Sequence, residues 1–228
     1  VRSIWTPQIF GIDAITTISA IASEFEGVRF GTAVVPTYPR HPMMLAAQAR
    51  TAQQVCGGGF TLGIGLSHQM VIENMLAMSF DKPVRHMREY LDVLLPLCRG
   101  EAVDVAGDTI GFHGALDIAA DPVPVLVAAL GSQMLKLAGA RAEGAVTWMT
   151  GLSTIESHIG PNLRAAATDA GRPDPRIVMA LPTCVTDDEA AARQVAAGAF
   201  EIYGYLPSYR AMLDREGAAG PADVALVG

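Results

Sequence analysis

The residues of this chain that are best suited to chemistry lie in short turns that follow apolar runs. One turn combines Gly63 and Gly65 with Ser67, His68 and Gln69 at the start of an expected helix. A hydroxyl, an imidazole and the N–H groups of a helix start could converge there on an anion. The turn is not a dinucleotide fingerprint, because His68 stands where that motif needs its third glycine. The alternative interpretation is that Ser67 only caps the helix.

Two further turns offer different groups. Thr6 and Gln8 follow the first apolar run, and the amide of Gln8 supplies both a donor and an acceptor. Ala129, Gly131 and Ser132 follow a later run, where small side chains would let a ligand approach the backbone. The alternatives are a polar loop residue for Gln8 and a simple helix cap for Ser132.

Two more features belong near these turns. Three prolines in the stretch 36–42 predict a rigid, extended loop, in which His41 is either a ligand contact or the residue that begins a helix. Trp148 ends another apolar run and could pack against a ring system or belong to the core.

Several familiar arrangements are absent from the sequence: the G-x-S-x-G nucleophile elbow, the phosphate-binding loop and the H-E-x-x-H zinc motif. His86 and His113 lack carboxylates at metal-ligand spacing, and His158 is expected on a helix surface. We therefore expect no metal. The shortage of acids and bases at the turns favours a cofactor that brings its own chemistry.

Composition restricts the possible partners. The 228 residues are 50% apolar and 17% charged, with a net charge of −7 and no Lys/Arg run. This composition indicates a sheet buried on both faces and argues against nucleic acid or an anionic membrane as partner. No apolar run approaches the roughly 20 residues that cross a bilayer, and no secretory signal is visible. Three cysteines without a C-x-x-C pair favour inert core thiols and a reducing, cytoplasmic location.

Apolar runs alternate with helical patterns in six βα units. The expected strands are 3–6, 28–35, 60–63, 123–129, 145–148 and 176–185, and the expected helices include 13–25, 84–99, 132–143, 153–170 and 187–200. This order predicts an α/β fold, a parallel (β/α)8 TIM barrel in a single domain over 1–228. The stretch 100–119 reads as a β-hairpin inserted at the barrel rim. We expect one βα unit to be missing before the chain and about one after it.

The turns also carry a family resemblance. The segments 31–42, 60–69 and 85–90, with 124–139 and 144–151, are similar to the luciferase-like monooxygenase superfamily, and most to its coenzyme F420-dependent oxidoreductases. The resemblance implies a bacterial luciferase-like barrel with F420 at the strand C-termini, hydride transfer with a small organic substrate, and a homodimer. The alternatives are an FMN-dependent monooxygenase that uses O2, and a non-catalytic barrel that only binds a ligand.

The resemblance also implies particular contacts. A non-proline cis peptide would join Ala33 to Val34 against the deazaflavin. Sugar-phosphate dehydrogenases of the family carry Asp-His where this chain has Pro7-Gln8, and Glu where it has Leu66, which argues against a sugar-phosphate substrate. The catalytic residues stay unknown, with Gln8 and His68 as candidate orienters. The cofactor contacts that we predict are Thr6, Gln8, Ala33, Val34, Gly63, Gly65, Ser67, His68, Ala129, Gly131, Ser132 and Trp148.

Overall fold

The computed structural model describes residues 1–8 and 10–228, and these form two compact units. Unit 1 comprises residues 1–128 with 141–143, and unit 2 comprises residues 129–140 with 144–228. The prediction of a single barrel domain over 1–228 stays a prediction.

Unit 1 alternates strands and helices as the apolar runs predict. Its elements are β1 (Ser3–Thr6), α1 (Ala14–Ile21), the 3-10 helix η1 (Ala22–Glu24), β2 (Arg29–Thr32), β3 (Val35–Pro36), α2 (Pro42–Val55), β4 (Phe60–Gly65), the π-helix η2 (Val71–Met75), α3 (Pro83–Arg99), β5 (Val103–Ala106), β6 (Gly111–Gly114) and β7 (Val125–Ala128).

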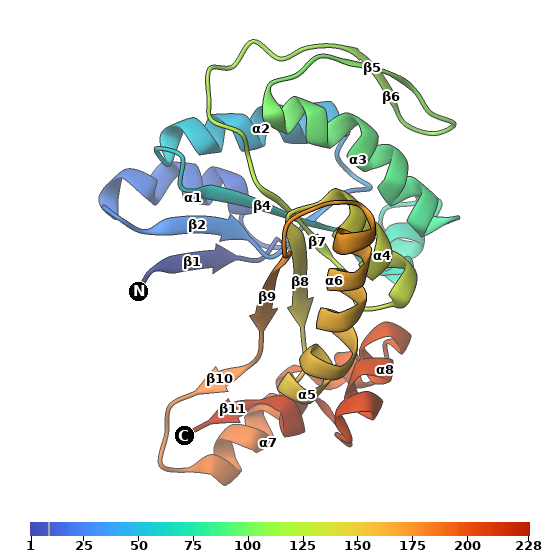
Figure 1. Ribbon diagram of the computed structural model, residues 1–228. Helices are drawn as coiled ribbons and strands as arrows, with labels where there is room; N and C mark the ends of the chain where they lie inside the picture. The colour runs from blue at the N-terminus through green and yellow to red at the C-terminus, as the bar shows by residue number, and fades with distance from the viewer. Residues whose placement is uncertain (9) are drawn as a thin grey trace. The chain divides into compact units, whose positions relative to one another are not determined.

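Apart from β5 and β6, the strands of unit 1 form a parallel sheet in the order β1-β2-β4-β7, with the short β3 also paired to β4. Every residue of β4 is buried, as expected for a strand that is covered on both faces. Figure 1 shows α1 and α2 beside β2 and β4, with the hairpin β5–β6 beyond α2 and α3. The order of the predicted strands and helices of this region is confirmed, but the strand predicted over 28–35 is interrupted at residues 33–34, between β2 and β3.

The hairpin predicted within 100–119 is present, because β5 and β6 pair antiparallel. Glu89 of α3 is hydrogen-bonded to the turn between β5 and β6. The carboxylate accepts hydrogen bonds from the Thr109 N–H (3.0 Å), the Thr109 hydroxyl (2.8 Å) and the Ile110 N–H (3.2 Å), while Arg85 Nε donates to it at 3.0 Å. Burial raises the pKa of Glu89, but these donors outweigh burial and hold the pKa at about 2.

Glu89→Gln is expected to lower the free energy of unfolding at pH 7 by about 1–2 kcal/mol, because charge-assisted hydrogen bonds become neutral ones. The folded pKa lies below the ordinary value of 4.5. The ionised Glu89 carboxylate therefore contributes its full stabilisation when the pH is above 4.5, and this contribution is lost as the pH falls toward about 2. Urea unfolding at pH 7 and at about pH 2.5 should show a gap between variant and wild type that shrinks in acid. The exposed control Glu26→Gln should show no gap, and a pH-independent gap for Glu89→Gln would contradict the assignment.

Unit 2 begins after β7. Its elements are α4 (Ser132–Arg141, whose last residue belongs to unit 1), β8 (Gly144–Trp148), α5 (Leu152–Thr154), the π-helix η3 (Ile155–Ile159), α6 (Gly160–Asp169), β9 (Arg176–Ala180), β10 (Thr183–Cys184), α7 (Glu189–Ala199), η4 (Glu201–Gly204), α8 (Pro207–Glu216), η5 (Pro221–Val224) and β11 (Leu226–Val227).

The strand pairs of unit 2 are β8–β9 and β10–β11, both parallel. The strand predicted over 176–185 is interrupted at residues 181–182, because Pro182 has no N–H with which to continue a ladder. α4 packs closely on α6: a Cβ at Gly139 would lie 2.3 Å from the Leu163 carbonyl oxygen. The glycine therefore permits this close packing.

The expected position of His158 on a helix surface is wrong. The residue is only 6% exposed and lies in η3, a π-helical turn between α5 and α6. A π-turn holds one residue more than an α-turn, so it changes which side chains of the helix face inward. The periodicity of an unbroken α-helix therefore misplaces this side chain.

The three cysteines differ in exposure. Cys98 is buried and Cys56 is half-buried, but Cys184 is exposed at the short strand β10, so the expectation of three core thiols is wrong there.

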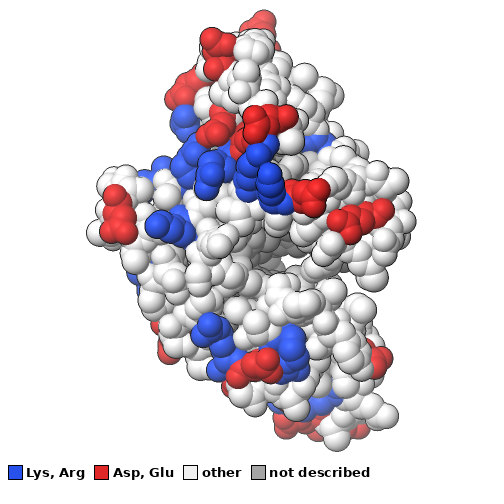
Figure 2. Space-filling view, turned by 90° about the vertical axis from the view of Figure 1, so that its right-hand side faces the viewer, with Lys and Arg blue, Asp and Glu red and all other residues white. Residues whose placement is uncertain are grey.

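Over residues 1–8 and 10–228, no helix has the length and apolar character needed to cross a membrane. Figure 2 shows acidic side chains next to basic ones on the face in view. The ion pairs of the described chain include those of Arg85 with Glu89 and Asp108.

Candidate cofactor-binding site

The residues predicted to contact a cofactor are divided between the two units. Those of unit 1 lie in the carboxyl-terminal parts of β1 and β4 or directly after β1, β2 and β4: Thr6, Gln8, Ala33, Val34, Gly63, Gly65, Ser67 and His68. Those of unit 2 are Ala129, Gly131, Ser132 and Trp148, at the start of α4 and the end of β8. The carboxyl ends of parallel strands are where ligands bind in α/β folds.

The centre of the unit 1 group is an interruption between β2 and β3. Ala33 and Val34 leave the ladder there, and the peptide bond between them is cis, as the resemblance implies. The buried Thr32 hydroxyl replaces the missing backbone pairing. It donates to the Gly63 carbonyl at 2.8 Å and accepts from the Gly63 N–H at 2.9 Å. Thr32 therefore joins β2 to β4 at the point where the predicted contacts Ala33 and Val34 begin.

Gly63 and Gly65 lie inside β4 and not in a turn, so the strand is two residues longer than predicted. A Cβ at Gly63 would lie 2.0 Å from the Thr32 carbonyl oxygen, and a Cβ at Gly65 would lie 2.6 Å from Val34 Cγ2. Close approach of the neighbouring segment thus explains why both residues are glycines. Their contact with a cofactor stays a prediction.

The turn after β4 carries Ser67 and His68, both half-buried. Ser67 has a φ of 63°, and within the described chain its hydroxyl has no hydrogen-bond partner. The N–H groups of Val71 and Ile72 donate to the His68 carbonyl, so the structure does not support the alternative that Ser67 caps this helix. Burial lowers the pKa of His68, which favours the neutral imidazole at pH 7.

The two polar atoms of the Gln8 side chain have different surroundings. Its Oε1 accepts from the N–H of Ala14 at 2.6 Å, next to Asp13, which caps α1 by accepting from Thr16 N–H at 2.9 Å. Among the residues that the structure describes, the Gln8 amide nitrogen has no partner. The Thr6 carbonyl accepts a hydrogen bond from the Ala33 N–H at 3.0 Å. The end of β1 therefore lies next to the interruption between β2 and β3.

Sequence reasoning missed an aromatic group beside this region. The Tyr38 ring stacks on His86 (centroids 4.0 Å apart) and on Phe80 (5.2 Å), and the Thr37 hydroxyl lies 3.0 Å from His86 Nε2. Burial, and then the charges of two nearby carboxylates, raise the pKa of Tyr38 to about 12. The proline-rich loop is thus held against α3, but a separation of about fifty residues hides the contact in the sequence.

His41 is the residue that begins α2, as one of its two predicted roles requires. Its Nδ1 accepts from the Met43 N–H at 3.2 Å, and its Nε2 lies 3.2 Å from the carbonyl oxygen of Gly111 on the hairpin. His41 therefore caps α2 and contacts β6.

In unit 2, the turn before α4 is open on one side. Ala129 is buried, whereas Gly131 and Ser132 are exposed, and a Cβ at Gly131 would meet nothing within 4 Å. Trp148 packs edge-on against Phe200 (5.6 Å) and Tyr203 (6.1 Å). The contacts of these residues with a cofactor stay predictions.

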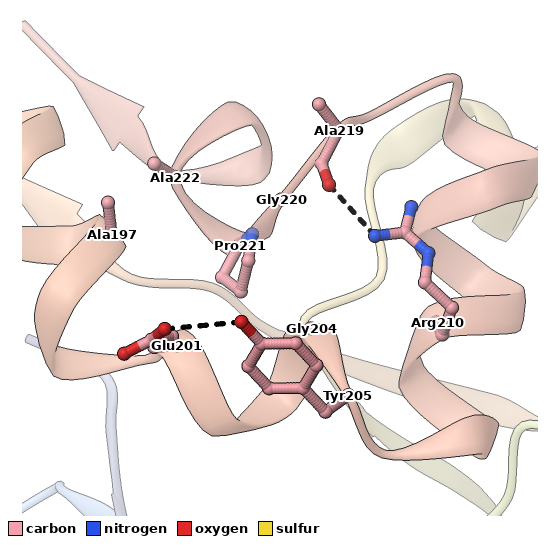
Figure 3. A pocket seen from close by; sticks show the side chains of 9 residues that line it. All are labelled: Ala197, Glu201, Gly204, Tyr205, Arg210, Ala219, Gly220, Pro221 and Ala222. Atoms are coloured by element: carbon pink, nitrogen blue, oxygen red, sulfur yellow. Dashed lines mark hydrogen bonds between the residues drawn. The ribbon is translucent and has the colours of Figure 1, made fainter.

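A pocket of about 290 Å³ lies elsewhere in unit 2, between η4 and the segment 219–222. Figure 3 shows its polar groups paired with their neighbours: the Tyr205 hydroxyl donates to Glu201 at 3.2 Å, and Arg210 donates to the Ala219 carbonyl at 2.8 Å. It contains none of the predicted site residues, and its groups are already satisfied, so we do not assign a ligand to it.

The unit 1 group offers neutral hydrogen-bonding groups and no charged pair. An amide N–H of Gln8, the Ser67 hydroxyl and a neutral His68 fit a cofactor that carries its own redox chemistry. Within the described residues there is no cluster of three potential metal ligands.

Known proteins resemble this chain in sequence and structure. A family model described as luciferase-like monooxygenase matches residues 2–225. A 5,10-methylenetetrahydromethanopterin reductase of Methanolobus tindarius is 28% identical over 93% of this chain and 66% of its own length. An F420-dependent glucose-6-phosphate dehydrogenase of Kineococcus radiotolerans is 26% identical over 79% of this chain and 55% of its own length. The chain spans about two thirds or less of the length of these curated relatives.

The fold has a solved counterpart. An F420-dependent secondary alcohol dehydrogenase, solved in complex with an F420-acetone adduct, matches with a TM-score of 0.80 at 19% identity, over 99% of this chain and 76% of that one. At this identity the likeness concerns the fold alone. It confirms the predicted fold class, the luciferase-like α/β barrel.

Proposed function

Because the chain belongs to the luciferase-like monooxygenase family, we propose that it is an F420-dependent oxidoreductase that transfers a hydride between the deazaflavin and a small organic substrate. The observation that carries this proposal is its sequence likeness to an F420-dependent dehydrogenase. The absence of an acid/base pair among the strand-end residues of unit 1 supports it, because a deazaflavin supplies the redox chemistry itself.

The predicted site residues of unit 1 would bind the cofactor and orient the substrate. The Ser67 hydroxyl and the His68 imidazole follow β4 and would hold polar groups of the cofactor. The Gln8 amide nitrogen would donate to a substrate or cofactor oxygen, while its Oε1 stays with Ala14. Pro7-Gln8 and Leu66 stand where sugar-phosphate dehydrogenases of the family carry Asp-His and Glu, so we propose a small substrate without a sugar phosphate, and a solvent-derived proton.

Fluorescence quenching tests the cofactor. The full-length protein is titrated with F420 and with FMN, and F420 is expected to bind at least about tenfold more tightly. Gly131→Val provides the matched variant: the added side chain begins in open space, so thermal unfolding should change little while F420 binding weakens. Binding of FMN alone, with oxygen consumption that depends on reduced FMN, would replace this proposal by the FMN-dependent monooxygenase. Tight F420 binding without turnover on a broad substrate panel would favour the non-catalytic barrel.

The remaining parts of the proposal rest on the family. We propose a homodimer and a cytoplasmic location, since family analogy and the unpaired cysteine count are what support them. The expected partners are a small-molecule substrate and F420, with no nucleic acid, membrane or metal.

A further inference from the structure

We infer that His158 is a positioning residue for the cofactor: it holds the Leu130 carbonyl and thereby fixes the turn at Gly131 and Ser132 for binding. The inference rests on the proposed function, because it assigns the cofactor to that turn. All the residues involved belong to unit 2. His158 itself would touch neither cofactor nor substrate.

The central contact is a hydrogen bond across 28 residues of sequence. His158 Nε2 lies 2.9 Å from the Leu130 carbonyl oxygen. A carbonyl only accepts, so Nε2 carries the proton and donates. The Asn162 side-chain nitrogen lies 3.4 Å from Nδ1 and donates to the His158 carbonyl at 2.7 Å. These contacts fix the orientation of the imidazole, with Nε2–H directed at the Leu130 carbonyl.

The turn is fixed on one side and open on the other. His158 is nearly buried, at 6% exposure, and a buried imidazole without partners would be costly. Gly131 follows directly after the held carbonyl, and a Cβ there would meet nothing within 4 Å. Backbone groups that are exposed yet held from behind are suited to binding a ligand without ordering a loop.

The helix that carries His158 is itself anchored at its start. Glu216 of α8 accepts from the N–H of Ser153 at 3.2 Å and from that of Thr154 at 2.8 Å. Gly151 leaves room for this carboxylate, because a Cβ there would lie 2.3 Å from Glu216 Cδ. The π-turn η3 then directs His158 inward, toward Leu130. A π-turn is often found at functional sites, and here it brings the His158 donor to the Leu130 carbonyl.

The test compares two replacements in the full-length protein. His158→Gln keeps a donor near the position of Nε2, whereas His158→Leu removes it. His158→Leu is expected to weaken F420 binding by about tenfold and to speed amide hydrogen exchange at Leu135, whose N–H donates to the Gly131 carbonyl of the turn at 2.9 Å. His158→Gln should restore both to near the wild-type values. Leu213→Val, which trims a fully buried side chain of unit 2, is the control for general loss of stability and should leave F420 affinity unchanged.

The outcomes separate this inference from the proposed function. If the wild type binds no F420, the proposed function fails, and the exchange rates alone decide whether His158 holds the turn. If His158→Leu keeps wild-type affinity and exchange, the inference is overturned. If Leu213→Val weakens binding as much as His158→Leu does, the effect is structural and the inference is again overturned. Should His158→Leu not fold, Asn162→Ala takes its place, with a loss of about two- to threefold expected and wild-type affinity as the contrary result.

Discussion

Gly63→Ala is expected to destabilise the protein by about 3 kcal/mol or more, which is a large fraction of the stability of a typical domain. The added Cβ would lie 2.0 Å from the Thr32 carbonyl oxygen and 3.1 Å from the Thr32 carbonyl carbon. Both are backbone atoms of a neighbouring strand, so no side-chain rotation can relieve the overlap. β4 is buried throughout, and a shift of this strand would also break the bonds between the Thr32 hydroxyl and Gly63. Urea unfolding would measure the loss.

Two other glycine replacements serve as comparisons for the stability of the Gly63→Ala variant. Gly198→Ala lies within α7, where a Cβ meets nothing within 4 Å, and should stabilise the protein by about 0.5–1 kcal/mol. Gly65→Ala should fall between the two, because its nearest contact is the Val34 side chain at 2.6 Å. A Gly63→Ala variant within about 1 kcal/mol of wild type would show that the strands move apart easily.

The order of the elements could be read from the sequence, because a strand buried on both faces is an apolar run whatever it packs against. Thus 3–6 and 145–148 were predicted within one residue of β1 and β8. The end of β4 could not be read. Gly63 and Gly65 look locally like a turn, and the reason for both glycines is a neighbouring segment some thirty residues earlier in the chain. Such a contact leaves no local pattern.

The candidate site was predicted in the same uneven way. The family motif led to the cis peptide between Ala33 and Val34, which the structure contains, whereas no periodicity points to such a bond. His158 was misplaced because its π-turn breaks the helical period on which the expectation depended. Trp148 could be read either as a ring contact or as core, and its rings pack against Phe200 and Tyr203. The order of strands and helices can therefore be predicted from the sequence, whereas contacts between distant elements cannot.

The contacts of Arg50 could not be predicted from the sequence either. No motif contains this residue, yet in the structure it joins separate segments of unit 1. It is 4% exposed, and within the described residues no carboxylate pairs with it; its guanidinium donates to the carbonyls of Cys98, Ile118 and Ala120. The first is near the end of α3, and the other two lie in the segment that returns from the hairpin toward β7. Cations are favourable at a helix C-terminus, so one side chain both caps α3 and holds the returning segment.

Arg50→Met is expected to lower the free energy of unfolding by about 2–4 kcal/mol, because buried carbonyls lose their donors and each unsatisfied group costs about 1–3 kcal/mol. The loss is moderated because the buried Arg50 Nε has no partner within the described residues, and methionine removes that group. Thermal unfolding would measure the loss, and limited proteolysis should become faster within 115–121.

The matched control is Arg99→Met, in the same part of unit 1. Arg99 is 49% exposed and pairs with Glu101, which is 53% exposed, and exposed pairs of this kind contribute at most about 1 kcal/mol. Arg50→Lys should be intermediate, since one ammonium group cannot reproduce the geometry with which a guanidinium reaches separate carbonyls. Equal stability of the Arg50→Met and Arg99→Met proteins would mean that the returning segment is held by its apolar contacts. Selective cleavage within 115–121 in the Arg50 variant would instead place the loss where the guanidinium acts.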